Sequence, residues 1–217
     1  NKKKWFNQYP GQNISSHDWL HWTGNAQNWN TMCASCHSTN LVKNYDTKTD
    51  SYKTTYDIIN VSCESCHGAG LNHSKYLNSK EYKAGEKTVG SYLKMHKKSS
   101  LLEVINDCAP CHARVSEITQ KHIDSKEIMD NYIPEIPSTE HFHADGQVDD
   151  EDYIYTSFLQ SRMFHKGVTC STCHNPHSVK LKRIGNQTCT LCHIPTKYDV
   201  PSHTFHKKGT PAAECKN

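Results

Sequence analysis

Five copies of the sequence Cys-x-x-Cys-His constrain this chain more than any other feature. Two cysteines at this spacing form thioether bonds to the vinyl groups of haem, and the histidine that follows reaches the iron from the proximal side. The array therefore predicts five molecules of haem c. The first to fifth motifs are Cys33, Cys36 and His37; Cys63, Cys66 and His67; Cys108, Cys111 and His112; Cys170, Cys173 and His174; and Cys189, Cys192 and His193.

Paired cysteines also occur in zinc ribbons, disulfide frameworks and thioredoxin-type redox sites. None of these requires a histidine directly after the second cysteine. Here histidine occupies that position in all five motifs, and no Cys-x-x-Cys occurs without it. The array therefore favours haem attachment over a structural metal or disulfide protein.

The composition predicts a fold built around its cofactors. Hydrophobic residues make up 35% of the 217 residues, whereas globular chains average about 45–50%. Five porphyrin rings, about one for every 43 residues, would supply the apolar area that side chains lack. We expect a fold that is mainly α, with long loops, little β and a haem core. It should form a single multihaem unit over 1–217, with a looser half at 1–100 and three complete motifs in 101–217.

Charge and hydropathy bear on partners and location. The net charge is +3 without any long basic or acidic run, which indicates neither a nucleic-acid partner nor an anionic membrane surface. No apolar stretch approaches the roughly 20 residues that cross a bilayer, so we expect no transmembrane segment in this chain. Covalent haem attachment predicts a periplasmic or extracellular location. Because the start at Asn1 does not resemble a signal peptide, a leader is expected to be removed or to lie upstream.

Cys215 is the one cysteine outside the five motifs. A second cysteine and a histidine after it would complete a sixth motif, and we interpret the chain as ending inside that motif. The alternatives are a free thiol, an intermolecular disulfide and haem attachment through a single thioether bond. A Lys-ligated motif of the nitrite reductase type would need cysteine at position 212, which is Ala212.

Turn residues predict the local structure around the first three motifs. Residues 41–56 favour a β-hairpin around the polar turn Asp46–Asp50. Ser100 and Glu103 form the pattern of a capping box that opens a short helix into the third motif. The Lys-rich segment 75–98 has few apolar residues and is expected to be solvated.

Periodicity predicts two longer helices. Residues 113–131 show a helical pattern in which Glu117 and Lys121 have the favourable four-residue spacing. Residues 149–166 form an amphipathic pattern with acidic residues in its first turn and basic residues in its last. Gly167 is expected to end this second helix.

Sixteen histidines form a second strong signal, because His is a common axial ligand of haem iron. Eleven remain outside the motifs, and five of them would be distal ligands if every iron has two His ligands. Sequence context supports His177 beside Pro176, His73 after a glycine turn, His21 in a Trp-rich segment, His122 on a helix face, His143 and His165 flanking the acidic helix, and His203 and His206. His17, His96 and His141 have the least support.

Four stretches of this chain resemble the central region of a family of bacterial multihaem c-type cytochromes, some of which carry tetratricopeptide repeats. The stretches are HWTGNAQNWNTMCASCHSTNL (His21–Leu41), INVSCESCHGAGLNH (Ile59–His73), FHADGQVDDEDYIYTSFLQSRMFHKGVTCSTCHNPHS (Phe142–Ser178) and YDVPSHTFHKKGTPAAEC (Tyr198–Cys215). The resemblance covers most of the chain outside 75–135, where the third motif lies.

The resemblance implies that the chain is an internal portion of a longer haem array, with a motif upstream and another beginning at Cys215. It also implies electron transfer with redox protein donors and acceptors. Among the spare histidines it favours distal ligands over His122 and His165. The favoured residues are His21, His73, His143, His177 and the pair His203 and His206, from which we take His206.

Two functions remain open at this point. One is an electron conduit of closely spaced haems with two His ligands each, alone or as a homo-oligomer or filament in which a neighbouring chain supplies a missing ligand. The other is a multihaem reductase or oxidase of a small nitrogen or sulfur compound, with one open iron beside acid or base residues. The abundance of histidine favours the conduit, so we assign no catalytic residue.

Overall fold

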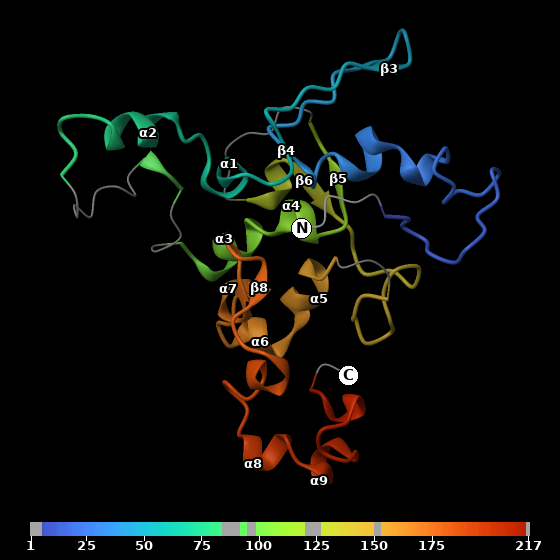
Figure 1. The fold of residues 1–217 in the computed structure, drawn as a ribbon, viewed down its shortest axis with the longest axis vertical. Helices are drawn as coiled ribbons and strands as arrows, with labels where there is room; N and C mark the ends of the chain where they lie inside the picture. The colour runs from blue at the N-terminus through green and yellow to red at the C-terminus, as the bar shows by residue number, and fades with distance from the viewer. Residues whose placement is uncertain (1–5, 84–91, 95–98, 120–126, 150–152, 216–217) are drawn as a thin grey trace. The chain divides into compact units, whose positions relative to one another are not determined.

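The computed structural model describes residues 6–83, 92–94, 99–119, 127–149 and 153–215 (Figure 1). The chain divides into two compact units, Asn1–Thr156 and Ser157–Asn217, here called unit 1 and unit 2. The single unit expected over 1–217 stays a prediction. Among the described residues, no helix has the length and apolar character needed to span a membrane.

Short helices carry the second and third motifs in unit 1. α1 (Cys63–His67) contains the whole second motif. α3 (Leu101–Asn106) leads into α4 (Ala109–His112) of the third motif. Other helices in the described part of unit 1 are η1 (Asn25–Gln27), the π-helix η2 (Trp29–Cys33), α2 (Leu71–Leu77) and η5 (Ile128–Asp130).

The capping box at the start of α3 is confirmed. The Ser100 hydroxyl accepts the backbone N–H of Glu103 at 3.3 Å, and the Glu103 carboxylate accepts the backbone N–H of Ser100 at 2.7 Å. These two bonds satisfy N–H groups that have no partner within the helix. The third motif therefore follows a helix whose start is fixed by its own sequence.

Antiparallel strand pairs separate the first and second motifs. β2 (Tyr45–Asp46) pairs with β3 (Ser51–Tyr52), which confirms the expected hairpin. Below it, β1 (Ser38–Thr39) follows the first motif and pairs with β4 (Ile58–Ile59), which precedes the second. Thr39 is 1% exposed, and its hydroxyl contacts the Ser65 hydroxyl inside the second motif at 2.8 Å. The pairing thus holds two motifs together although 30 residues separate them.

In the described part of 113–131, residues 113–119 and 127–131, the expected helix is not formed, and Lys121 lies outside the described residues. Val115–Glu117 instead forms β5, which pairs antiparallel with β6 (Tyr132–Pro134). The carboxylate of Glu117 contacts the distant Lys43. β-branched residues fit a pleated strand, and pairing with a distant segment outweighs a local helical pattern.

The described part of 149–166, which leaves out 150–152, contains two short helices instead of the single expected helix. α5 (Tyr155–Gln160) stops before Ser161, whose hydroxyl accepts a backbone N–H of α6 (Arg162–His165) at 3.2 Å. An oxygen in this position caps a new helix, which explains the break. Gly167 follows α6 with φ +82°, a conformation that glycine adopts without strain, so the expected end is confirmed.

The described core of unit 1 is small and lies at the motifs themselves. Ala34, inside the first motif, and Ala109, inside the third, are fully buried, and Ile105 of α3 is 1% exposed. The hydroxyl of Tyr155 donates a hydrogen bond to the side-chain oxygen of Asn106 at 2.8 Å, and both residues are buried. Packing therefore concentrates where haem would be attached.

Unit 2 consists of turns and single-turn helices joined by loops. α7 (Cys170–Cys173) opens the fourth motif, and β7 (His174–Asn175) pairs with β8 (Lys180–Leu181) in a short hairpin. Proline stands at the first position of three helices, where its missing N–H costs no bond. These are α8 (Pro195–Tyr198), α9 (Pro201–Thr204) and η7 (Pro211–Ala213), and η6 (Gly185–Thr188) precedes the fifth motif.

Replacing Ile105 by Ala should lower the free energy of unfolding by about 2–5 kcal/mol, because it leaves a cavity in the core. Ile136→Ala is the matched control, since Ile136 is 81% exposed and should change stability by less than about 0.5 kcal/mol. Guanidinium denaturation followed by circular dichroism measures both. Equal effects of the two substitutions would contradict this account of the core.

Candidate haem attachment sites

All five motifs adopt one helical turn. The histidine N–H donates to the carbonyl of the first cysteine at 3.0 Å in the first, third and fifth motifs. His174 makes the same bond to Cys170, and the second motif lies wholly within α1. Residues three and four apart lie on one side of a helical turn, so both thiols and the imidazole are presented together. This arrangement fits two thioether bonds and a proximal ligand.

The cysteines keep their thiols in this arrangement. All eleven lie among the described residues, and none of them forms a disulfide bond. Cysteine pairs on a single turn, each followed by histidine, therefore have the side chains that haem c requires. A haem group bound here would supply a one-electron carrier, while the protein would set its ligands and surroundings.

The first and third motifs meet in unit 1. The sulfur of Cys36 lies 3.8 Å from the carbonyl oxygen of Pro110 and 4.0 Å from that of Cys111. A hydrogen bond between the two thiols lowers the pKa of Cys36 to about 7 and raises that of Cys111. Two attachment sites that lie 75 residues apart in the sequence are therefore adjacent in the fold.

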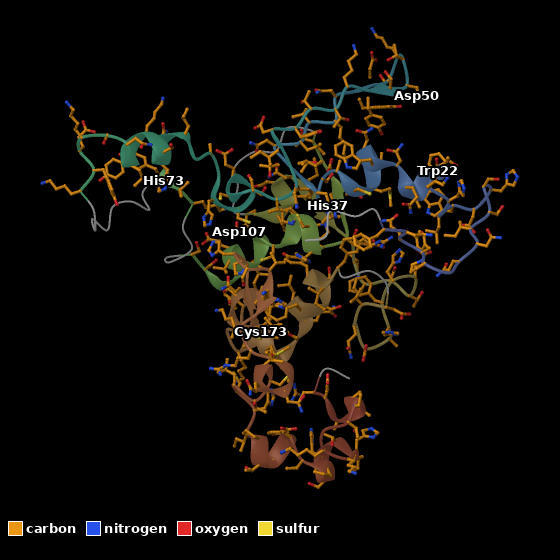
Figure 2. The ribbon with its side chains drawn as sticks, in the orientation of Figure 1. Trp22, His37, Asp50, His73, Asp107 and Cys173 are labelled. Carbon is orange, nitrogen blue, oxygen red and sulfur yellow. The ribbon has the colours of Figure 1, made fainter. Side chains whose placement is uncertain are left out.

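The second motif is linked to the third by Lys94. The backbone carbonyl of Lys94 accepts a hydrogen bond from Nδ1 of His67 at 2.9 Å. A carbonyl only accepts, so the proton is on Nδ1, and Nε2 is the nitrogen with the lone pair that iron needs. The ammonium of Lys94 in turn lies 2.7 Å from the carboxylate of Asp107, labelled in Figure 2, which directly precedes the third motif.

Burial and the negative charge of Asp107 raise the pKa of the Cys66 thiol, which places this carboxylate near the second motif. Sequence analysis missed Lys94, because it lies in a segment expected to be solvated. In the sequence, the only local signal for the ion pair of Lys94 and Asp107 was the position of Asp107 directly before Cys108.

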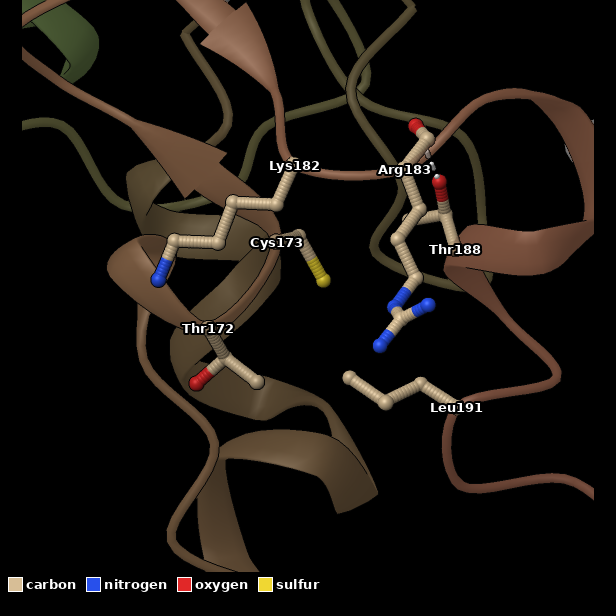
Figure 3. Close-up of a pocket in the computed structure, with 6 residues that line it drawn as sticks. All are labelled: Thr172, Cys173, Lys182, Arg183, Thr188 and Leu191. Carbon is tan, nitrogen blue, oxygen red and sulfur yellow. Dashed lines mark hydrogen bonds between the residues drawn. The ribbon is translucent and has the colours of Figure 1, made fainter.

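The fourth and fifth motifs line a common pocket in unit 2. Figure 3 shows the sulfur of Cys173 pointing into this space, with Arg183 and Leu191 facing it. The hydroxyl of Thr188 donates to the Arg183 carbonyl at 3.0 Å and fixes that wall. The volume is about 430 Å³, and the lining residues are Thr172, Cys173, Lys182, Arg183, Thr188 and Leu191. The two cations, Lys182 and Arg183, fit a ring that carries acidic groups.

Cys215 lies beside the fifth motif. Burial and a nearby Cys215 thiol raise the pKa of Cys189. The side chain of Asn186 accepts the backbone N–H of Cys215 at 2.9 Å and donates to Asp199 at 2.8 Å. The segment around Cys215 is thereby held against the start of the fifth motif.

In two of the expected distal ligands, one ring nitrogen already contacts another side chain. Nδ1 of His21 lies 2.7 Å from the hydroxyl of Thr23, so Nε2 is the nitrogen directed elsewhere. Nε2 of His143 lies 2.9 Å from the carboxylate of Asp149. Ligation of iron by His143 through Nε2 would therefore require this contact to break.

The other distal candidates occupy helices and turns. His73 lies in α2, labelled in Figure 2, and the exposed His177 lies in the turn of the β7–β8 hairpin. His206 is exposed, whereas the ring of His203 lies 5.1 Å from Tyr198, whose ring is 5.4 Å from the proximal His193. The structure thus connects His203, rather than our choice His206, to the fifth motif.

The distal assignments stay predictions. His165 packs its ring against Phe164 in α6. His96 and His122 lie outside the described residues.

Five cysteine pairs, each followed by a histidine on a helical turn, fit the attachment of haem c that defines c-type cytochromes. Residues 9–68, which include the first two motifs and His21, match the family model for cytochrome c554 and c-prime. The match supports a c-type cytochrome that binds haem c. No curated protein and no solved structure was found to match the chain.

Within the matched stretch, Gly24 fixes the turn that follows His21. A Cβ at this position would lie 2.4 Å from the Trp19 carbonyl oxygen, so Gly24→Ala should cost about 1–3 kcal/mol of stability. Gly70→Ala is the control, because its Cβ would meet only the flexible side chain of Glu64, at 3.3 Å. Guanidinium denaturation of both variants tests the difference. A larger loss in the control would refute this role of Gly24.

Proposed function

We propose that this protein is a multihaem c-type cytochrome that transfers electrons between redox protein donors and acceptors through closely spaced haems with two His ligands each. The contact between Cys36 of the first motif and Cys111 of the third carries the proposal. Haems attached at adjacent cysteines lie near each other, and closely spaced carriers pass electrons from one to the next. Covalent haem attachment supports a periplasmic or extracellular location for this activity.

The surface of the chain supports a haem core in a mainly α fold with long loops. Large apolar side chains near the motifs are exposed, including Val179 and Ile184 at 90% and 86% exposure. Haem rings would cover such surface and complete the core.

We propose five haems on the complete motifs, with Cys215 as the first cysteine of a sixth. The distal ligands in this proposal are His21, His73, His143, His177 and His206. A homo-oligomer or filament that supplies a ligand from a neighbouring chain stays a prediction. The geometry around Tyr198 supports His203 as the alternative to His206.

The number of haems can be counted by intact mass after denaturation, because thioether bonds survive unfolding. We expect five on the wild-type chain and four on the Cys33→Ala/Cys36→Ala variant. Cys215→Ala should retain five, since this cysteine lies outside the complete motifs. Loss of all colour on denaturation of the wild type would rule out covalent attachment.

Magnetic spectra of the oxidised protein test ligation. Two histidines on every iron predict only low-spin signals, because both axial positions are filled with strong ligands. A high-spin fraction of about one haem in five would argue against a pure conduit. Steady turnover of nitrite, hydroxylamine or sulfite by the same sample would then identify a reductase or oxidase.

A further inference from the structure

A carboxylate lies beside the contact between the first and third motifs. Glu117 ends β5, and one oxygen of its carboxylate accepts a hydrogen bond from the Ser35 hydroxyl at 2.5 Å. Its other oxygen lies 2.8 Å from the ammonium of Lys43. The side chains of Glu117 and Lys43 are only 20% and 18% exposed. Two segments distant in the sequence, one with Ser35 and Lys43 and the other with Glu117, thus meet at one ion pair.

The position of this ion pair relates it to two attachment sites. Ser35 stands between the two cysteines of the first motif, and Glu117 follows the third motif by five residues. Cys36 of the first motif in turn lies 4.0 Å from the carbonyl oxygen of Cys111 in the third motif. Burial, followed by the charge of Glu117, raises the pKa of Tyr132, which pairs with Glu117 across the strands. The field of the carboxylate therefore reaches the space around both motifs.

The contribution of the Glu117–Lys43 ion pair to stability is a weak reason for its presence. A largely buried ion pair contributes little net stability, because desolvation of both charges offsets their attraction. Its electrostatic effect on a nearby redox group is larger, since solvent screens charges poorly in the interior. A fixed negative charge stabilises the oxidised, more positive form of a haem and so lowers its reduction potential. Lys43 opposes this effect from the other side of the carboxylate.

We propose, on the basis of the proposed function, that Glu117 lowers the reduction potentials of the haems attached at Cys36 and Cys111. Lys43 limits the size of that effect, and the hydrogen bond from Ser35 holds the carboxylate beside the first motif. The Glu117–Lys43 ion pair thus adjusts the reduction potentials of two neighbouring haems. Glu117 and Lys43 change the reduction potentials through their charges and touch no reacting atom.

Redox titration of the holoprotein followed by visible absorbance tests the proposal. Glu117→Gln should raise the reduction potential of at least one haem by about 59 mV, which corresponds to a tenfold change in the equilibrium constant of a one-electron couple. Lys43→Gln should lower it, and the double variant should fall between the two. Glu140→Gln is the control, because the Glu140 side chain is 82% exposed and should leave the potentials unchanged.

Opposite shifts in the two single variants distinguish an electrostatic role from a structural one. Shifts in the same direction, or a Glu117→Gln shift no larger than that of Glu140→Gln, would overturn the proposal. If Glu117→Gln does not fold, Glu117→Asp should keep the wild-type potentials while Lys43→Gln still lowers them, and failure of either result overturns the proposal. A wild-type protein without covalently bound, redox-active haem would instead refute the proposed function.

Discussion

A haem held by two thioether bonds and one imidazole needs three side chains on the same side of a short backbone turn. The five motifs of this chain meet that requirement with one hydrogen bond, from the histidine N–H to the carbonyl of the first cysteine. The rest of the described structure can be understood as support for these turns. Strand pairs, capping residues and buried alanines are placed at their ends or inside them.

In unit 1 this support also brings the turns together. Thr39 joins the first motif to the second, Lys94 joins the second to the third, and Cys36 contacts Cys111 across the first and third. Each link is a polar or sulfur contact rather than aliphatic packing. A chain with 35% hydrophobic residues is thus organised by specific contacts around its motifs, and the largest apolar groups are expected to be the haems.

Local features were predictable from the sequence, and long-range pairing was not. The hairpin at 41–56 and the capping box at Ser100 depend on residues within a few positions of each other, and both predictions are confirmed. In the described part of 113–131 the expected helix is wrong, because β5 pairs with β6 and Glu117 contacts Lys43. No local signal specifies a partner 74 residues away.

The same limit applies to the candidate site. Cysteine and histidine spacing predicts the attachment turns and the proximal ligands, because the whole motif spans five residues. The spacing says nothing about the tautomer of His67, which depends on Lys94, or about the contact of His143 with Asp149. Distal ligands approach from other segments and follow from tertiary structure alone.

A crystal structure of the holoprotein, with iron positions located by anomalous scattering, tests the central claim most directly. The account predicts five irons, each bound by two histidine nitrogens, with the irons on His37 and His112 as immediate neighbours. It would be contradicted by a separation of these two irons by intervening protein, or by an iron with an open axial position.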